Sequence, residues 1–170
     1  GKHLLLLNRR YGSFFFIGEL MVDLDLAEDR PSKDYCGECT RCIDACPTGA
    51  IVQPHIVDAR KCISYLTIEH KSNIPGTFKG SFNNRVFGCD ICQDVCPWNL
   101  NAPSHDVEAL MPSGELMNKT RQEWFQMTEK EFLRLFQNSA VKRAKYQGLK
   151  RNLEFIREDA SSDPARPGKW

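Results

Sequence analysis

The chain has 170 residues, with 23 basic residues, 22 acidic residues and a net charge of +1. This balance excludes a strongly basic protein that binds nucleic acid through its bulk charge, so such a partner has to be sought in local patches. The apolar runs at residues 4–7 and 14–17 are too short to span a bilayer, which favours a cytoplasmic protein without a membrane segment.

Residues 1–33 are expected to contribute strand structure to a larger domain. The chain opens on Gly1 without an initiating methionine, which suggests a fragment whose N-terminal portion is missing. Residues 13–20 are dense in aromatic and β-prone side chains, so we expect them to form a strand that completes a sheet. The polar, proline-broken stretch 29–34 predicts a surface connection into the next domain.

Residues 34–100 are predicted to form one domain. Short strands are expected at 51–52 and 56–57, followed by a helix from about Ala59 to Glu69 that Asp58 caps. Cys62 would lie in the first turn of this helix, where the helix dipole favours a thiolate. Residues 71–87 form a long polar loop, and a loop of this length is usually functional or mobile, so it could approach a substrate.

Residues 101–160 are predicted to be helical. Thr120 with Glu123, and Thr128 with Glu131, have the spacing of two capping boxes. A third helix is expected over 140–157. Its apolar side would carry Val141, Ala144, Gly148, Leu149, Leu153 and Ile156, and its other side is basic, with Lys142, Arg143, Lys145, Lys150 and Arg151. Residues 161–170 read as a disordered tail.

The eight cysteines carry the chemistry. They form the runs Cys36-x2-Cys39-x2-Cys42-x3-Cys46-Pro47 and Cys89-x2-Cys92-x3-Cys96-Pro97, with Cys62 between them. In bacterial two-cluster ferredoxins the last cysteine of a run ligates the other cluster. This rule predicts two 4Fe-4S clusters, one bound by Cys36, Cys39, Cys42 and Cys96, the other by Cys46, Cys62, Cys89 and Cys92. Overall we expect an α+β fold, with a bacterial-ferredoxin-like two-cluster domain followed by a small helical region.

Two other uses of the cysteines were weighed. A disulfide framework is typical of short secreted chains, and this chain is longer and has no signal peptide. Zinc sites use four ligands in paired spacing, which does not account for the Cys-x2-Cys-x2-Cys-x3-Cys-Pro run. The basic helix face is by itself more often a solvated surface than a phosphate-binding one.

Several segments together resemble the epoxyqueuosine reductase family. They are Gly1-Lys2-His3, residues 11–19, the first cysteine run with Thr48-Gly49-Ala50-Ile51, residues 62–69, residues 88–99 and residues 142–152. The resemblance implies a cobalamin-dependent enzyme that reduces epoxyqueuosine to queuosine at the wobble position of tRNA. This chain would then be its electron-relay portion, left with a remnant of the cobalamin domain and incomplete as a catalyst, since the family's proposed proton donor lies outside it.

The resemblance also implies roles for individual residues. Asp90 and Ile91, between Cys89 and Cys92, would lie against the cobalamin, with Ser13 and Ser64 as further polar contacts. The basic helix face would contact tRNA phosphates. The implied partners are tRNA and an external electron donor, and we expect a monomer.

Two alternatives remain at this point. A reductive dehalogenase also couples two such clusters to cobalamin, but the basic helix would then have no explanation. A ferredoxin-type module that passes electrons to another partner is the second alternative, and cobalamin binding by the parent protein discriminates it from the enzyme.

Overall fold

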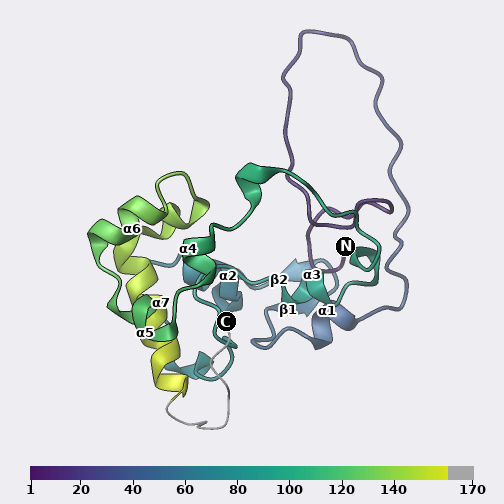
Figure 1. Ribbon diagram of the computed structural model, residues 1–170. Coiled ribbons are helices and arrows are strands. Elements are labelled where there is room, and N and C mark those ends of the chain that lie inside the picture. The colour runs from purple at the N-terminus through teal and green to yellow at the C-terminus, as the bar shows by residue number, and fades with distance from the viewer. Residues whose placement is uncertain (161–170) are drawn as a thin grey trace. The chain divides into compact units, whose positions relative to one another are not determined.

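The computed structural model describes residues 1–160, which form mainly short helices and a small two-stranded sheet (Figure 1). They divide into two compact units. The first unit comprises Gly1–Cys46, Ile51–Val57 and Asp90–Ser104, and the second comprises Pro47–Ala50, Asp58–Cys89 and the chain from His105 onward. The domain boundaries at residues 33 and 100 stay a prediction, and the predicted tail at 161–170 lies outside the described residues.

The first unit is built from very short elements. They are α1 (Arg41–Asp44), β1 (Ile51–Gln53), β2 (Ile56–Val57), α3 (Ile91–Asp94) and the 3-10 turn η3 (Pro97–Asn99). The antiparallel strands confirm the two that were predicted, and His55 turns the chain between them with a φ of 62°. α1 packs against both α3 and β1. The packing of these elements brings the two cysteine runs together.

The strand predicted at 13–20 is wrong. This segment has no regular structure, and the nearest pairing is an isolated bridge between Asn8 and Gly12. A strand forms only where another strand accepts its backbone hydrogen bonds, and no described residue pairs with this segment. The β-prone side chains are therefore left in solvent, with Phe16 86% exposed and Leu20 92% exposed.

The second unit is helical. Its elements are η1 (Ala59–Lys61), α2 (Ile63–Ile68), η2 (Gly76–Phe78), η4 (Glu108–Leu110), α4 (Gly114–Met117), α5 (Arg121–Gln126), α6 (Glu129–Leu135), η5 (Ala140–Ala144) and α7 (Lys145–Ala160). Helices α2, α5 and α6 all pack against α7, the long helix drawn in yellow in Figure 1. α7 is thus the element around which this unit is organised.

The helix predicted over 58–69 is interrupted. Asp58 does cap its start, since its side chain accepts a hydrogen bond from the Arg60 N–H, but the turn that follows is the 3-10 turn η1. Cys62 then takes an extended conformation, with φ −71° and ψ 124°, and α2 begins after it. Cys62 therefore lies at the N-cap of a second helix, not in the first turn of a continuous one.

The helix predicted over 140–157 is also divided, at Lys145, whose φ of 60° separates η5 from α7. Ala144, Leu149, Leu153 and Ile156 are buried as predicted, while Val141 and Gly148 are half-buried. The Thr120 capping box is complete. Thr128 caps α6 through the Glu131 N–H, but the Glu131 carboxylate pairs with Lys119 at 2.5 Å, so the second box is only half formed.

Two hydrophobic clusters hold the second unit. One contains Ile63, Leu66, Ile74, Phe82, Phe155 and Ile156, and the other Met127, Phe132, Phe136, Leu149 and Leu153. Ile74 and Phe82 belong to the segment 71–87, and Phe82 is fully buried. These two apolar side chains attach the predicted loop to the core, and its approach to a substrate stays a prediction.

A buried polar pair on α7 ties the helix to this segment. Asn152, which has no exposed surface, donates hydrogen bonds to the carbonyl oxygens of Thr67 (2.7 Å) and Val86 (2.8 Å). The Arg151 guanidinium donates to the carbonyl oxygens of Leu66 (2.8 Å) and His70 (2.5 Å). Both side chains therefore satisfy backbone acceptors that α2 and the loop leave unpaired.

We expect Asn152→Ala to lower the free energy of unfolding by about 2–4 kcal/mol, because two carbonyl groups lose their donor in a buried place. Urea unfolding followed by circular dichroism measures the change. Gln147→Ala, an exposed position on the same helix, is the control and should stay within about 0.5 kcal/mol of the unsubstituted protein. Equal unfolding midpoints for the two variants would contradict the assigned role of Asn152.

Candidate iron-sulfur centre

Four cysteines line a single cavity in the first unit. The cavity has a volume of about 230 Å³, and its walls include Cys36, Cys39, Cys42 and Cys96. Three of these thiols come from the first run and one from the end of the second run, 54 positions beyond Cys42 in the printed sequence. The structure thus brings together the four residues that the spacing rule assigned to the first cluster.

The two runs share one local conformation. α1 follows Thr40 and α3 follows Asp90, and these preceding residues have similar backbone angles, with φ −121° and ψ 5° at Thr40 and φ −113° and ψ 12° at Asp90. After each turn the next cysteine N–H bonds back to a carbonyl of the turn, Cys46 to Ile43 and Cys96 to Gln93. The proline that follows disfavours helical geometry at the cysteine, and Cys96 is accordingly extended.

One thiol of this cavity has a perturbed pKa. Burial raises the pKa of the Cys42 thiol, and the neighbouring Cys36 and Cys96 sulfurs raise it further. Because metals bind the thiolate form of cysteine, binding of a metal by Cys42 would release its proton.

The donor set fits a 4Fe-4S cluster, in which each of four irons takes one cysteine thiolate. None of the eight cysteines, which all lie in the described part of the chain, is joined in a disulfide in this structure. Within residues 1–160, no three His, Cys, Asp or Glu side chains converge closely enough to hold a single metal ion. A cubane cluster, by contrast, separates its four ligands around its own volume.

The remaining four cysteines are divided between the units. Cys46 and Cys92 belong to the first unit and Cys62 and Cys89 to the second, so this ligand set stays a prediction. Within the second unit, α2 organises two of them. Cys62 immediately precedes α2, and the Cys89 N–H donates to the Ser64 Oγ of α2 at 3.0 Å.

Ser13 joins the N-terminal segment to the second cysteine run. Its Oγ donates to Gln93 Oε1 and accepts from Asn99 Nδ2, both at 2.9 Å. The preceding Gly12 has a φ of 71°, and a Cβ there would lie 2.0 Å from Asn99 Oδ1, so only glycine permits this approach. The segment is held against the turn that precedes Cys96.

The four residues predicted to contact cobalamin all make contacts within the protein or lie at its surface. The Ser13 hydroxyl bonds within the first unit, and the Ser64 hydroxyl accepts the N–H of Cys89. Asp90 is exposed, with its carboxylate accepting from Gln93 Nε2 at 2.8 Å, and Ile91 is half-buried. Their contact with cobalamin stays a prediction.

The predicted tRNA-contacting residues differ in their surroundings. Lys142 and Lys145 are exposed, and Arg143 is exposed and pairs with Glu69 at 2.6 Å. Arg151 is a correction: its guanidinium points inward to the backbone carbonyls described above, so it is a structural residue rather than a phosphate contact.

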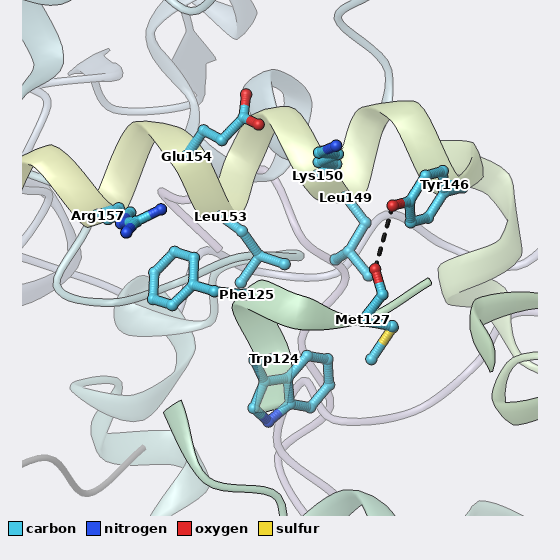
Figure 2. Close-up of a pocket in the computed structure, with 9 residues that line it drawn as sticks. All are labelled: Trp124, Phe125, Met127, Tyr146, Leu149, Lys150, Leu153, Glu154 and Arg157. Carbon is cyan, nitrogen blue, oxygen red and sulfur yellow. Dashed lines mark hydrogen bonds between the residues drawn. The ribbon is translucent and has the colours of Figure 1, made fainter. Parts of the chain in front are cut away.

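Lys150 lies beside a second cavity, of about 150 Å³, between α5 and α7 (Figure 2). Figure 2 shows Trp124 and Phe125 on one side, with Leu149 and Leu153 of α7 facing them. The Tyr146 hydroxyl donates to the Met127 carbonyl at 3.1 Å, and the Lys150 Nζ lies 5.9 Å from the Tyr146 ring centroid. These aromatic side chains are partly buried and pack against the hydrophobic cluster that includes Leu149 and Leu153 of α7.

Sequence reasoning missed two residues of the cysteine cavity. Lys2 and His3 are both buried and line the cavity with the four thiols. Lys2 Nζ donates to the carbonyl oxygens of Gly37 (2.5 Å) and Cys39 (3.0 Å). The only signal available was their place in the segment Gly1-Lys2-His3, which carried the family resemblance but no assigned role.

Comparison with known proteins agrees with the cysteine geometry. The family described as "4Fe-4S double cluster binding domain" matches residues 35–99. This match supports the binding of iron-sulfur clusters by this part of the chain.

The relatives define the chain more closely. It is 55% identical over 157 residues to the epoxyqueuosine reductase of Cellulophaga algicola, covering 92% of this chain and 51% of that protein. The solved structure of epoxyqueuosine reductase from Bacillus subtilis matches with a TM-score of 0.85 at 32% identity, over 95% of this chain and 44% of that one. An epoxyqueuosine reductase solved with a tRNA stem loop matches with the same TM-score at 31% identity, over 98% of this chain and 47% of that one.

The predicted resemblance to epoxyqueuosine reductases is therefore confirmed over nearly the whole chain. The chain spans about half the length of the curated relatives it matches. No helix among the described residues is long and apolar enough to cross a membrane.

The shared cavity makes a prediction about Cys96. In the full-length parent protein, Cys96→Ala should remove the same cluster as Cys36→Ala, because both thiols line one cavity. Iron content should fall from about eight to about four atoms per protein, and both variants should lose the same paramagnetic resonance signal after reduction.

Cys92→Ala is the matched control, since Cys92 also lies in the second run but does not line this cavity. It should remove the other signal. If Cys96→Ala and Cys92→Ala lose the same signal, the crossed ligand assignment is wrong.

Proposed function

We propose that the protein represented by this chain reduces epoxyqueuosine to queuosine in tRNA, and that this chain carries the electron relay of the enzyme. The observation that carries the proposal is the convergence of four thiols from two sequence-distant runs in one cavity, within a chain similar to epoxyqueuosine reductases. When bound, the two 4Fe-4S clusters supply one-electron transfer.

The residues of this chain bind and shield the clusters. The first cluster would take Cys36, Cys39, Cys42 and Cys96, and burial of Cys42 and Cys96 keeps water away from two of its corners. The second would take Cys46, Cys62, Cys89 and Cys92, with Ser64 fixing the backbone of Cys89. Together they would form the ferredoxin-like two-cluster arrangement that the spacing predicts.

The stoichiometry of the proposed reaction determines how many electrons the relay has to deliver. Converting an epoxide to an alkene consumes two electrons and two protons and releases the oxygen as water. The cysteines of this chain would hold clusters that supply one electron each, so two one-electron deliveries, with electrons from an external donor, would be needed in each turnover. Cobalamin is part of the proposal for the whole protein, and Ser13, Ser64, Asp90 and Ile91 stay its predicted contacts in this chain.

Exposed cations of η5 and α7 are proposed to contact tRNA phosphates. Lys142, Arg143, Lys145 and Lys150 remain in this group, whereas Arg151 is withdrawn from it because its donors are used within the fold. The support is chemical, in that exposed Lys and Arg side chains are what phosphate binding requires, together with the related enzyme solved with a tRNA stem loop.

The comparisons do not favour the alternatives of a ferredoxin-type module or a reductive dehalogenase, because the matched relatives are epoxyqueuosine reductases. Cytoplasmic location and a monomeric state stay predictions.

The direct test uses the full-length parent protein with both clusters and cobalamin, under anaerobic conditions with a strong reductant. It is incubated with tRNA that carries epoxyqueuosine, and nucleoside mass spectrometry quantifies queuosine. We expect conversion that depends on the reductant. A preparation with both clusters present and reducible, yet without conversion, would contradict the proposed reaction.

We expect Lys142→Ala in the same protein to weaken tRNA binding and to lower the slope of log affinity against log salt by about 0.7–1, because one phosphate contact is lost. Fluorescence anisotropy across a salt series measures the slope. Lys130→Ala, an exposed lysine of α6, is the matched control and should leave the slope unchanged. An unaltered slope for Lys142→Ala would remove this residue from the tRNA interface.

A further inference from the structure

The cysteine cavity has a wall of two consecutive basic side chains. Lys2 is 8% exposed and His3 is 5% exposed, and both line the cavity that holds Cys36, Cys39, Cys42 and Cys96. Lysine is almost never buried to this extent unless it is paired. The described residues show no ion pair of Lys2 at contact distance. The one carboxylate that its charge reaches is that of Asp34, whose pKa is lowered mainly by the Cys36 N–H and in smaller part by Lys2, and Asp34 is exposed, so water screens this attraction.

Lys2 is instead directed at the backbone of the first cysteine run. Its ammonium donates to the carbonyl oxygens of Gly37 and Cys39, which lie between ligands of the first cluster. These two bonds hold the loop, but carbonyl oxygens do not neutralise the charge. A cubane cluster bound by four thiolates is anionic, and one-electron reduction adds a further negative charge, so a cluster in this cavity would place a negative charge beside the buried Lys2 ammonium.

His3 contributes a donor without an acceptor. Its Nδ1 accepts a hydrogen bond from the Leu5 N–H at 3.2 Å, so in the neutral ring the proton is on Nε2. Burial lowers the pKa of His3, which favours this neutral form. The Nε2 atom is buried and has no hydrogen-bond partner among the described residues. A buried polar atom of this kind calls for a partner other than the described residues.

We propose that Lys2 and His3 set the reduction potential of the first cluster, Lys2 through the charge of its ammonium and His3 through an Nε2–H hydrogen bond to a cluster sulfur. This inference rests on the proposed function, because it requires that the cavity holds a 4Fe-4S cluster. Both interactions are stronger with the reduced, more negative cluster, so both raise its potential. Hydrogen bonds to sulfur and the local charge are the means by which proteins tune such clusters.

Arg41 provides an internal comparison. It lines the same cavity and carries the same charge, but its side chain is exposed. Water screens an exposed charge much more than a buried one. Lys2 should therefore act on the cluster strongly and Arg41 weakly, although both side chains reach the cavity.

The test is a redox titration of the full-length parent protein, with the midpoint potential of each cluster followed by electron paramagnetic resonance. Lys2→Gln retains amide donors for the two carbonyls and removes the charge. It should lower the potential of the first cluster enough to change the ratio of reduced to oxidised cluster at least tenfold at a fixed poise, about 59 mV for one electron. His3→Phe should lower it in the same direction, and Lys2→Arg should restore most of the original value.

The controls are Arg41→Gln and His105→Phe, the latter an exposed histidine of the second unit. Both should leave the first potential nearly unchanged, and all variants should leave the second cluster unchanged. Equal potentials for Lys2→Gln and the unsubstituted protein would overturn the role of Lys2, and equal potentials for His3→Phe would overturn that of His3.

Two further outcomes separate the possible failures. Loss of the first cluster in both Lys2→Gln and Lys2→Arg would show that Lys2 only supports the loop, which also overturns the proposed tuning. If the unsubstituted protein takes up no cluster in this cavity, the proposed electron relay itself fails, independently of the two basic residues.

Discussion

The first unit depends on the convergence of four thiols in one cavity. Both hydrophobic clusters identified among the described residues belong to the second unit, whereas the buried residues of the first unit gather around Cys42 and Cys96 and include Lys2, His3 and Ser13. Short helical turns of four residues, such as α1 and α3, are not stable by themselves. A bound cluster would supply cross-links between them that a conventional core supplies elsewhere, so folding of this unit and metal binding are expected to be coupled.

The second unit, unlike the first, has two hydrophobic clusters that pack around α7. Its backbone between α2 and Cys89 has little regular secondary structure, so many of its carbonyl groups depend on side chains for hydrogen bonds. Asn152 and Arg151 supply donors to five carbonyls in this region, those of Leu66, Thr67, His70, Ser72 and Val86, and Phe82 fixes the loop by burial. The same region then positions Cys89 through Ser64, so the packing of α7 supports a proposed cluster ligand from a distance.

Polar side chains near the cysteines are mostly engaged in holding the backbone of the cysteine runs. Ser13 and Asn99 fix the N-terminal segment to the turn before Cys96, and Lys2 holds the turn between Cys36 and Cys39. The Ser13 hydroxyl, which was predicted to contact cobalamin, forms hydrogen bonds with the Gln93 and Asn99 side chains in this structure. His3 differs, because its Nε2 is buried without a partner in the described residues and is available for a group that the chain does not contain.

The sequence by itself determined the cysteine chemistry, the two short strands and most of the buried face of α7. Those features depend on local spacing. Thiols at fixed intervals predict metal ligands, and apolar residues at helical intervals predict a buried helix face, without knowledge of the tertiary structure. Only the tertiary structure decided the rest. Residues 13–20 have strand composition but no partner strand, Arg151 has the charge of a phosphate contact but is drawn inward by unpaired carbonyls, and Lys2 and His3 acquire their importance from burial beside residues more than 30 positions away. Each of these outcomes depends on contacts between residues that are far apart in the sequence. A local sequence pattern carries no information about such contacts.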